Sequence, residues 1–132
     1  MSRKKVIILG AGVAGLSTAV CIQSCCPHLE LEIVAEHFSP HTTSDGSGGF
    51  WEPYATGSDV DRFLRMGEVT FNYLMGLANS PLAGEIGVQL ISGYTLDHGE
   101  SEPSYRHIVD GYRKLTPTEL ARFPKFQLSF FF

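Results

Sequence analysis

Three glycines near the N-terminus have the spacing of a loop that cradles phosphate. Gly10, Gly12 and Gly15 follow the pattern G-x-G-x-x-G, directly after the apolar residues 6–9 and before a helix-like stretch. The first glycine permits a sharp exit from a strand, the second lets the backbone approach a pyrophosphate, and the third lets helix and strand pack closely. The first N–H groups of the helix would carry a partial positive charge toward the phosphates. The pattern predicts a dinucleotide site.

An acidic residue stands where such a site needs one. Glu36 follows Gly15 by 21 residues, directly after an apolar segment. A carboxylate there accepts hydrogen bonds from ribose hydroxyls and favours a free 2′-hydroxyl over a 2′-phosphate, so FAD or NAD is preferred to NADP. Taken alone, Glu36 reads more readily as a solvated strand end, and only the glycines in register favour the ribose role. Spacing leaves FAD and NAD open.

The surrounding elements must hold these residues in place. Residues 6–9 are β-branched or leucine and predict a fully buried strand. A helix is expected over 13–25, ended by Pro27, and an alternating strand over 29–36. The apolar face of that helix is expected to carry Leu16, Ala19, Val20 and Gln23. The order predicts an α/β fold with a Rossmann-like β-α-β unit of parallel strands.

Beyond that unit the signals are more local. Residues 37–49 are rich in Ser, Thr, Gly and Pro and predict a long loop. A helix is expected from Ser58 to about residue 78, and strands over 88–96 and 106–115. Thr116-Pro117-Thr118-Glu119 predicts the capped start of a short helix. The last seven residues, FQLSFFF, are uncharged, and their phenylalanines are expected to lack a sheet to pack against.

Composition excludes several classes of function. The formal net charge is −4 and no basic stripe occurs, so a nucleic-acid partner is not expected. No apolar stretch reaches membrane-spanning length, so no membrane partner is expected and the protein is expected to be intracellular. The histidines have no metal-ligand spacing. The three cysteines are expected to be small buried or half-buried groups on the first helix, with a redox role as the lesser alternative.

Five longer segments resemble one family. These are GAGVAGLSTAVCI, FSPHTTSDGSGGFWEPY, TFNYL, ANSPLAGEIGVQLISGY and GYRKLTPTELARFP, and they cover the chain to about Pro124. In sequence and order they resemble the N-terminal part of the D-amino-acid oxidase and D-aspartate oxidase family. The resemblance implies that residues 1–132 are the N-terminal, FAD-binding part of an oxidoreductase domain that is incomplete here, with the substrate half absent.

The resemblance also implies roles for individual residues. FAD would be the cofactor, bound extended, with the Thr-Thr-Ser run near its phosphates, the backbone around residues 49 and 50 beside the flavin, and Trp51, Glu52 and Tyr54 in supporting positions. Some of the expected cofactor-binding residues come from the glycine motif and others only from the resemblance, and together they are Gly10, Ala11, Gly12, Val13, Ala14, Gly15, Glu36, His37, Thr42, Thr43, Ser44, Gly49 and Phe50. No catalytic residue and no metal ligand is expected within this chain. The segment Gly46-Ser47-Gly48-Gly49 stands where the family commonly has VAAG, and His37 where it usually has a basic residue.

The implied reaction is the oxidative deamination of a D-amino acid, with O₂ as the oxidant. Products would be a 2-oxo acid, ammonia and hydrogen peroxide, and the location would be the peroxisome, or otherwise the cytoplasm, since no C-terminal peroxisomal signal is present. D-aspartate and neutral D-amino acids stay open as substrates, and the oligomeric state is unknown. Because the family's substrate-binding arginine lies beyond the matched positions, the chain alone is expected to be inactive. The alternatives are a product without independent activity and an unrelated NAD-binding module.

Overall fold

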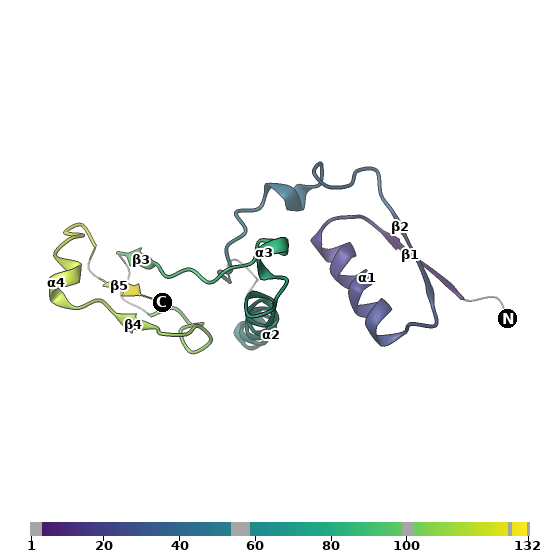
Figure 1. Ribbon diagram of the computed structural model, residues 1–132. Helices are drawn as coiled ribbons and strands as arrows, with labels where there is room; N and C mark the ends of the chain where they lie inside the picture. The colour runs from purple at the N-terminus through teal and green to yellow at the C-terminus, as the bar shows by residue number, and fades with distance from the viewer. Residues whose placement is uncertain (1–3, 54–58, 99–101, 127, 132) are drawn as a thin grey trace. The chain divides into compact units, whose positions relative to one another are not determined.

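The chain divides into two units, Met1–Phe50 and Trp51–Phe132 (Figure 1). The computed structural model describes residues 4–53, 59–98, 102–126 and 128–131. Each unit has its own secondary structure and is considered by itself.

The first unit is built from one helix and two parallel strands. Strand β1 spans Lys5–Leu9, helix α1 spans Val13–Cys25 and strand β2 spans Glu30–Val34. Each residue of β1 pairs with the residue 25 positions later, from Lys5↔Glu30 to Leu9↔Val34. The Gly10 N–H donates to the Val34 carbonyl at 2.8 Å and continues this ladder into the turn. The predicted β-α-β order with parallel strands is confirmed.

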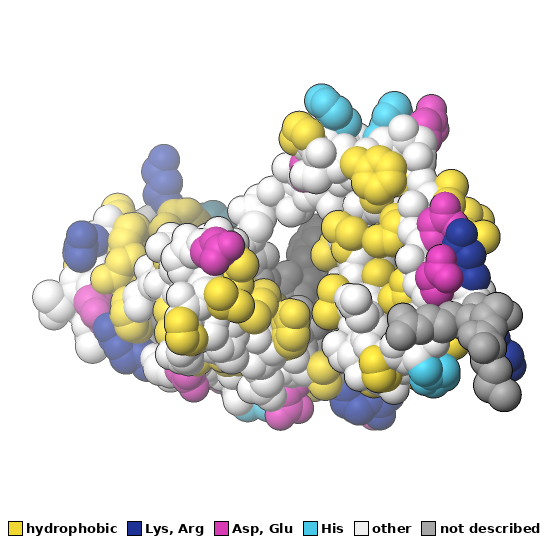
Figure 2. Space-filling model, turned by 45° about the vertical axis from the view of Figure 1, so that its right-hand side comes forward, with side chains coloured by type: hydrophobic (Ala, Val, Ile, Leu, Met, Phe, Trp, Pro, Cys, Tyr) yellow, Lys and Arg dark blue, Asp and Glu magenta, His cyan; other side chains and the backbone are white. Residues whose placement is uncertain are grey.

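The prediction that residues 6–9 form a fully buried strand is wrong for the described structure. Ile8 is buried, whereas Ile7 is 56% and Leu9 80% exposed. Alternate side chains of a strand point to opposite faces, and helix α1 covers only the face that carries Ile8. Apolar side chains consequently lie at the molecular surface (Figure 2). The alternation predicted for 29–36 is confirmed, since Leu31 and Ile33 are half-buried while Glu30 and Glu32 are exposed.

Helix α1 packs through a different stripe from the one predicted. Ala19 is half-buried as expected, but Leu16 and Val20 are exposed. The half-buried positions follow spacings of three and four residues and are Gly15, Ala19, Ile22 and Cys26. At Gly15 the missing side chain allows a close approach of the helix to the turn and to Ile8. Cys21 and Cys25 lie on the exposed side, contrary to the expectation of buried or half-buried thiols.

The second unit begins with a long helix. Helix α2 spans Val60–Ala78 and is followed by the short helix α3 at Ala83–Ile86. Its N-cap is Asp59, whose carboxylate accepts the Arg62 N–H at 2.9 Å. The predicted start at Ser58 lies outside the described residues. Of the predicted apolar stripe, Val60 is exposed and five members are half-buried: Phe63, Leu64, Phe71, Leu74 and Leu77.

An antiparallel sheet completes the second unit. Strand β3 spans Tyr94–Asp97, β4 spans Arg113–Lys114 and β5 spans Leu128–Phe131, in the order β3-β5-β4. The strands predicted over 88–96 and 106–115 are therefore largely wrong, because residues 88–93 and 106–112 are not strand. The central strand has only four residues, so each neighbour pairs over a short length.

The expectation that the C-terminal phenylalanines lack a sheet to pack against is also wrong. Phe130 is only 1% exposed, and its ring stacks on Tyr112 with centroids 5.2 Å apart. The Arg113 guanidinium lies 4.8 Å above the Phe131 ring. Because β5 is the middle strand, the pairing places Phe130 where both neighbouring strands shield it.

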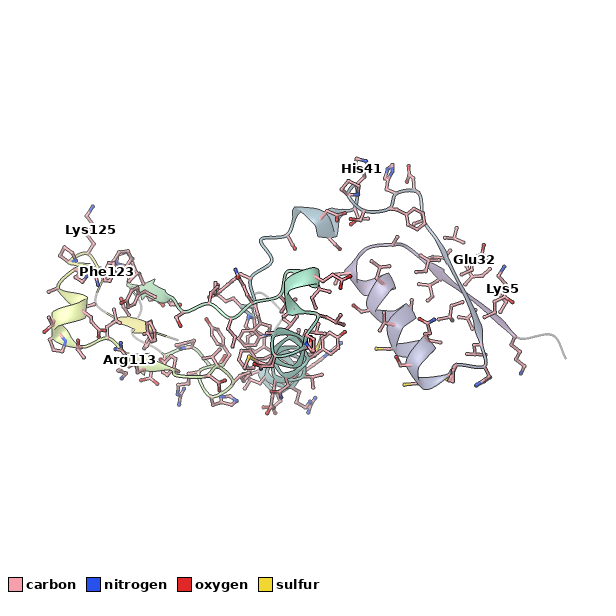
Figure 3. The ribbon with its side chains drawn as sticks, in the orientation of Figure 1. Lys5, Glu32, His41, Arg113, Phe123 and Lys125 are labelled. Atoms are coloured by element: carbon pink, nitrogen blue, oxygen red, sulfur yellow. The ribbon has the colours of Figure 1, made fainter. Side chains whose placement is uncertain are left out.

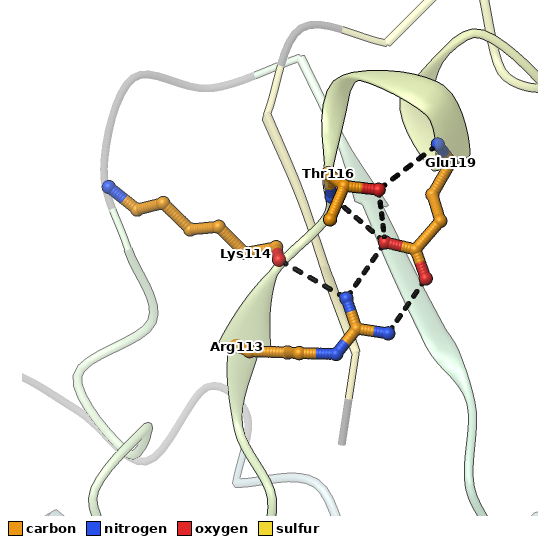
Figure 4. A network of polar contacts seen from close by, with 4 residues as sticks. All are labelled: Arg113, Lys114, Thr116 and Glu119. Carbon is orange, nitrogen blue, oxygen red and sulfur yellow. Dashed lines mark hydrogen bonds and ion pairs between the residues drawn. The ribbon is translucent and has the colours of Figure 1, made fainter.

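The capped start at Thr116 is confirmed. Helix α4 spans Pro117–Leu120, and Thr116 and Glu119 form a capping box. Arg113 donates to both oxygens of Glu119, at 2.7 and 2.8 Å (Figure 4). This ion pair and the N–H and hydroxyl of Thr116 lower the pKa of Glu119 to about 2. The helix cap that residues 116–119 predict is therefore also bonded to strand β4, through Arg113.

Candidate functional site: the glycine turn and its loop

The glycine turn between β1 and α1 is sterically tight at one position. Gly10 has a φ of +103°, which an L side chain rarely adopts. A Cβ added at Gly15 would lie 2.0 Å from the Gly10 carbonyl oxygen, a distance that no real side chain shows. Gly15 therefore allows α1 to start directly against the turn. This agrees with the packing role that its place in the motif indicates.

The N-terminus of α1 has N–H groups that lack acceptors within the helix. The first helical hydrogen bond is donated by Leu16 to the Gly12 carbonyl, at 3.0 Å. The N–H groups of Val13, Ala14 and Gly15 precede it and have no intrahelical acceptor. The first turn of α1 contains no acidic side chain. These features suit an anion such as a pyrophosphate.

A hydroxyl from the following loop already lies at this N-terminus. Ser44 Oγ accepts the Val13 N–H at 2.9 Å, although the two residues are 31 positions apart in the sequence. A Cβ added at Gly12 would lie 3.0 Å from the same oxygen. Of the hydroxyls in the Thr-Thr-Ser run, the fold thus brings Ser44 to the glycine turn. A side chain at Gly12 would enter the space in which the backbone and Ser44 meet a ligand.

The loop that carries Ser44 is held by an acidic residue that sequence reasoning missed. It contains a turn of 3₁₀ helix, η1, at Thr43–Gly46. Asp45 accepts the Thr42 N–H at 2.8 Å, the Thr42 hydroxyl at 2.6 Å and the Ser39 hydroxyl at 2.7 Å. These bonds, the Thr42 hydroxyl first, lower the pKa of Asp45. The spacing of Thr42 and Asp45 is that of a capping box, which was the available signal.

Glu36 lies just beyond the end of β2, on the chain that leads into this loop. Its side chain is 89% exposed, and its Oε1 is 3.7 Å from His37 Nε2. The loop continues past His41 on the same side of the unit as the ends of β1 and β2 (Figure 3). Glu36 is therefore accessible to a ligand whose phosphates lie at the α1 N-terminus, because the carboxyl ends of β1 and β2 share one edge of the sheet.

Most of the remaining predicted site residues that the structure describes are exposed. Ala11 is buried within the turn. Thr43 and Phe50 are exposed, and Gly49 has a φ of +66°. Tyr54 lies outside the described residues. Within the described part of the chain, no group of three or more His, Cys, Asp or Glu side chains could hold a metal ion, and no helix is long and apolar enough to cross a membrane.

The donor set of this site fits a dinucleotide cofactor such as FAD. The N–H groups at the start of α1 that have no acceptor within the helix suit a pyrophosphate, and the missing side chain at Gly12 leaves room for its approach. An exposed carboxylate at the end of β2 suits a ribose. The same features suit NAD, because the pyrophosphate and the adenosine ribose that they would bind are common to FAD and NAD.

A cluster in the second unit was not anticipated from the sequence. Trp51 packs edge-on against Phe71 of α2, with centroids 5.0 Å apart, and against Tyr105 at 5.8 Å. The Tyr105 hydroxyl donates to Glu52 Oε1 at 3.0 Å. Burial, followed by the hydrogen bond to Glu52, raises the pKa of Tyr105 to about 12. Tyr105 is therefore a neutral hydrogen-bond donor across the physiological pH range.

Comparison with known proteins confirms the family resemblance. The chain is 37% identical over 130 residues to a D-aspartate oxidase from Homo sapiens, covering 96% of this chain and 38% of that protein. It is 28% identical over 121 residues to a D-amino acid oxidase from Dugesia ryukyuensis, covering 90% and 36%. A D-amino-acid oxidase from Dictyostelium discoideum is 24% identical over 116 residues, covering 87% and 33%. The chain thus spans little more than a third of the length of these relatives. No protein-family model matches it.

Proposed function

We propose that this chain, similar over nearly its whole length to D-aspartate and D-amino-acid oxidases, is the FAD-binding portion of a flavin oxidase. The reaction would be the oxidative deamination of D-amino acids to 2-oxo acids, ammonia and hydrogen peroxide. The observation that carries the proposal is the glycine turn, where the first N–H groups of α1 have no acceptor within the helix, together with Glu36 just beyond the end of the paired strand. The names of the relatives supply the reaction.

The residues of this chain would hold and orient the cofactor. The N–H groups of Val13, Ala14 and Gly15 would bind the pyrophosphate, and Ser44 would either share its contact with Val13 or turn its hydroxyl toward a phosphate oxygen. The Glu36 carboxylate would accept the ribose hydroxyls. When bound, FAD would accept the hydride from the substrate and pass its electrons to O₂.

The Thr-Thr-Ser run would contribute unequally to this site. The Thr42 hydroxyl donates its hydrogen bond to Asp45, so it has only acceptor capacity left for a ligand. Phosphate oxygens need donors, which favours Ser44 and the backbone over Thr42. We therefore assign Thr42 the task of holding the loop and Ser44 that of meeting the phosphate.

The substrate class follows from the relatives rather than from the site. D-aspartate and neutral D-amino acids both stay candidates, because the relatives carry both names. A D-amino acid and O₂ would be the partners, with the peroxisome as the compartment that the family resemblance implies. The alternative, a product without independent activity, is not favoured by these similarities.

Titration of the chain with FAD, followed by flavin fluorescence, tests the proposal. Saturable binding is expected, and Gly12→Val is expected to abolish it because the side chain would enter the pyrophosphate path and displace Ser44. Gly76→Val in α2 is the matched control, since no atom lies within 4 Å of a Cβ added there. Equal FAD binding by the wild type and Gly12→Val would contradict the proposed site.

Peroxide release tests whether this chain has an oxidase activity of its own. The FAD-loaded chain would be assayed with D-aspartate and D-alanine, and with the L-enantiomers as controls. Release with the D-enantiomers alone supports an oxidase. Bound FAD without any release is expected both for the FAD-binding portion of an oxidase and for a product that lacks independent activity, and binding of NAD in preference to FAD would overturn both.

A further inference from the structure

Residues 39–45 of the loop fold around the carboxylate of Asp45. Its Oδ1 accepts the Ser39 hydroxyl at 2.7 Å, and its Oδ2 accepts the N–H and the hydroxyl of Thr42 at 2.8 and 2.6 Å. The Asp45 N–H donates in turn to the Thr42 carbonyl at 3.1 Å. We call Ser39, Thr42 and Asp45 the loop clasp. All three lie in the first unit of the chain, as does the glycine turn.

Ser44 stands inside the turn that the loop clasp closes. It lies between Thr42 and Asp45 in the sequence, and its Oγ accepts the Val13 N–H at 2.9 Å. A hydroxyl that accepts a hydrogen bond retains its own hydrogen for donation. Ser44 can therefore contact the N-terminus of α1 and offer a donor to a phosphate oxygen at the same time.

The residues that follow Ser44 give it little support. Gly46, Gly48 and Gly49 have no atom within 4 Å of an added Cβ. Glycine loses more conformational freedom on ordering than any other residue, so a stretch rich in glycine fixes a neighbouring side chain poorly. The backbone bond from the Ser47 N–H to the Ser44 carbonyl is long, at 3.2 Å. The position of Ser44 therefore depends on the loop clasp, which precedes these glycines.

The Asp45 carboxylate is itself unsuited to contact a dinucleotide. An ionised carboxylate only accepts hydrogen bonds, and both of its oxygens already accept them from the loop. Its negative charge also repels the charges of a pyrophosphate. Any favourable contribution of Asp45 to cofactor binding must therefore pass through the groups that it holds in place.

We propose that Asp45 is a positioning residue of the cofactor site, because it closes the turn that holds the Ser44 hydroxyl at the N-terminus of α1. This inference rests on the proposed function, since it concerns the affinity of that site for a pyrophosphate. Asp45 raises this affinity without touching the cofactor. A donor that already stands in place need not be ordered when the ligand binds, so less of the interaction free energy is lost.

Amide hydrogen exchange of the FAD-free chain tests whether Asp45 holds Ser44. The Val13 amide donates to Ser44 Oγ, so its exchange reports the position of that hydroxyl. In Asp45→Ala this exchange should accelerate about three- to tenfold, the worth of one hydrogen bond, as it should in Ser44→Ala. The Gly10 amide, which donates to the Val34 carbonyl, should keep its protection. Loss of both protections would show that Asp45 supports the whole unit and would overturn the inference.

The FAD dissociation constant tests whether Asp45 acts through Ser44. Asp45→Ala and Ser44→Ala should each raise this constant about three- to tenfold. Because one residue acts through the other, adding Asp45→Ala to Ser44→Ala should raise the constant no further. Additional weakening in the double variant would mean that Asp45 acts by another route, and the inference would be wrong.

Three single variants separate the geometry of the loop clasp from its charge. Asp45→Asn keeps an oxygen for Thr42 and can donate to the Ser39 hydroxyl, so it should protect the Val13 amide and bind FAD at least as tightly as the wild type. Ser39→Ala removes one bond of the clasp at a residue outside the predicted cofactor contacts, and it should weaken FAD binding as Asp45→Ala does. Asp61→Ala, at an exposed acid in the first turn of α2, is the matched control and should change neither readout. Weakened FAD binding by Asp45→Asn with normal Val13 protection would assign the carboxylate a direct role and overturn the inference.

Failure of the proposed function has a different signature. If the wild type binds no FAD, the proposed function fails and this inference falls with it. If the wild type and Asp45→Ala bind FAD equally, or if the Val13 amide exchanges at the same rate in both, Asp45 is not a positioning residue while the proposed function stands. If Asp45→Ala does not fold, Ser39→Ala decides in the same way, because it leaves the Asp45 carboxylate in the chain.

Discussion

Replacing Gly15 by alanine tests the idea that the glycine turn depends on a single steric contact. The added Cβ would lie 2.0 Å from the Gly10 carbonyl oxygen and 3.0 Å from its carbon. Both atoms belong to the backbone, so the contact cannot be relieved by rotating a side chain. The turn and the first residues of α1 must separate by about 1 Å before the oxygen reaches even 3.0 Å.

The sign of the change in stability that Gly15→Ala causes follows from two opposing effects. Forcing an extra carbon into a packed place costs about 1–3 kcal/mol. Alanine in place of glycine inside a helix recovers up to about 1 kcal/mol. We expect Gly15→Ala to destabilise β1 and α1 by about 2 kcal/mol. Gly76→Ala makes the same chemical change in α2, where no atom lies within 4 Å, and should stabilise that helix by about 0.4–1 kcal/mol.

Residue-resolved amide hydrogen exchange measures each substitution separately, Gly15→Ala in the first unit of the chain and Gly76→Ala in the second. Free energies of opening for the amides of β1 and α1 should fall in Gly15→Ala, and those of α2 should rise in Gly76→Ala. The Gly10 N–H donates a hydrogen bond to the Val34 carbonyl, next to the steric contact at the Gly10 carbonyl oxygen. The protection of the Gly10 amide should therefore fall first. Unchanged or increased protection of the Gly10 amide in Gly15→Ala would refute the steric argument.

Three further predictions concern other charged or polar groups. Glu36→Gln should weaken FAD binding by about 1–3 kcal/mol in a fluorescence titration, through loss of a charge-assisted hydrogen bond, with an unchanged far-ultraviolet circular dichroism spectrum; an unaltered dissociation constant would show that Glu36 does not reach the ribose. The pKa of Glu119 is lowered to about 2, so its contribution to stability is complete above its usual pKa of 4.5 and is lost as the pH falls from 4.5 toward 2; Glu119→Gln should remove this dependence from acid-unfolding curves, and curves identical to the wild type would contradict it. Ser129 is 3% exposed and its hydroxyl has no partner among the described residues, so Ser129→Ala should raise the free energy of unfolding by about 1 kcal/mol in urea, and a decrease would show that the hydroxyl is satisfied.

Features encoded by neighbouring residues could be predicted from the sequence. The strand, glycine turn and helix over residues 5–25 depend on local spacing, as does the capping box of Thr116 and Glu119. The parallel pairing of β1 and β2 also follows, because a short helix between two strands leaves few other arrangements. In each case a handful of adjacent residues determines the backbone conformation.

The residues of the candidate site come from the sequence, whereas their geometry comes from the structure. The glycines, Glu36 and Ser44 were identified from motif and resemblance. That the Ser44 hydroxyl meets the Val13 N–H, while the Thr42 hydroxyl is committed to Asp45, depends on the path of the loop. A run of three adjacent hydroxyl residues gives no indication of which one will face the helix.

The tertiary structure alone decided which apolar residues are buried. The FQLSFFF segment is recognisably apolar and uncharged from the sequence, but only the insertion of β5 between β3 and β4 buries Phe130. Similarly, residues 88–93 and 106–112 have strand-like composition, yet a strand exists only where a partner offers free N–H and C=O groups. Tyr105 and Glu52 meet across 53 residues for the same reason. Local propensity depends on a residue and its neighbours, whereas pairing and burial depend on segments that are distant in the chain, and no short sequence pattern specifies these.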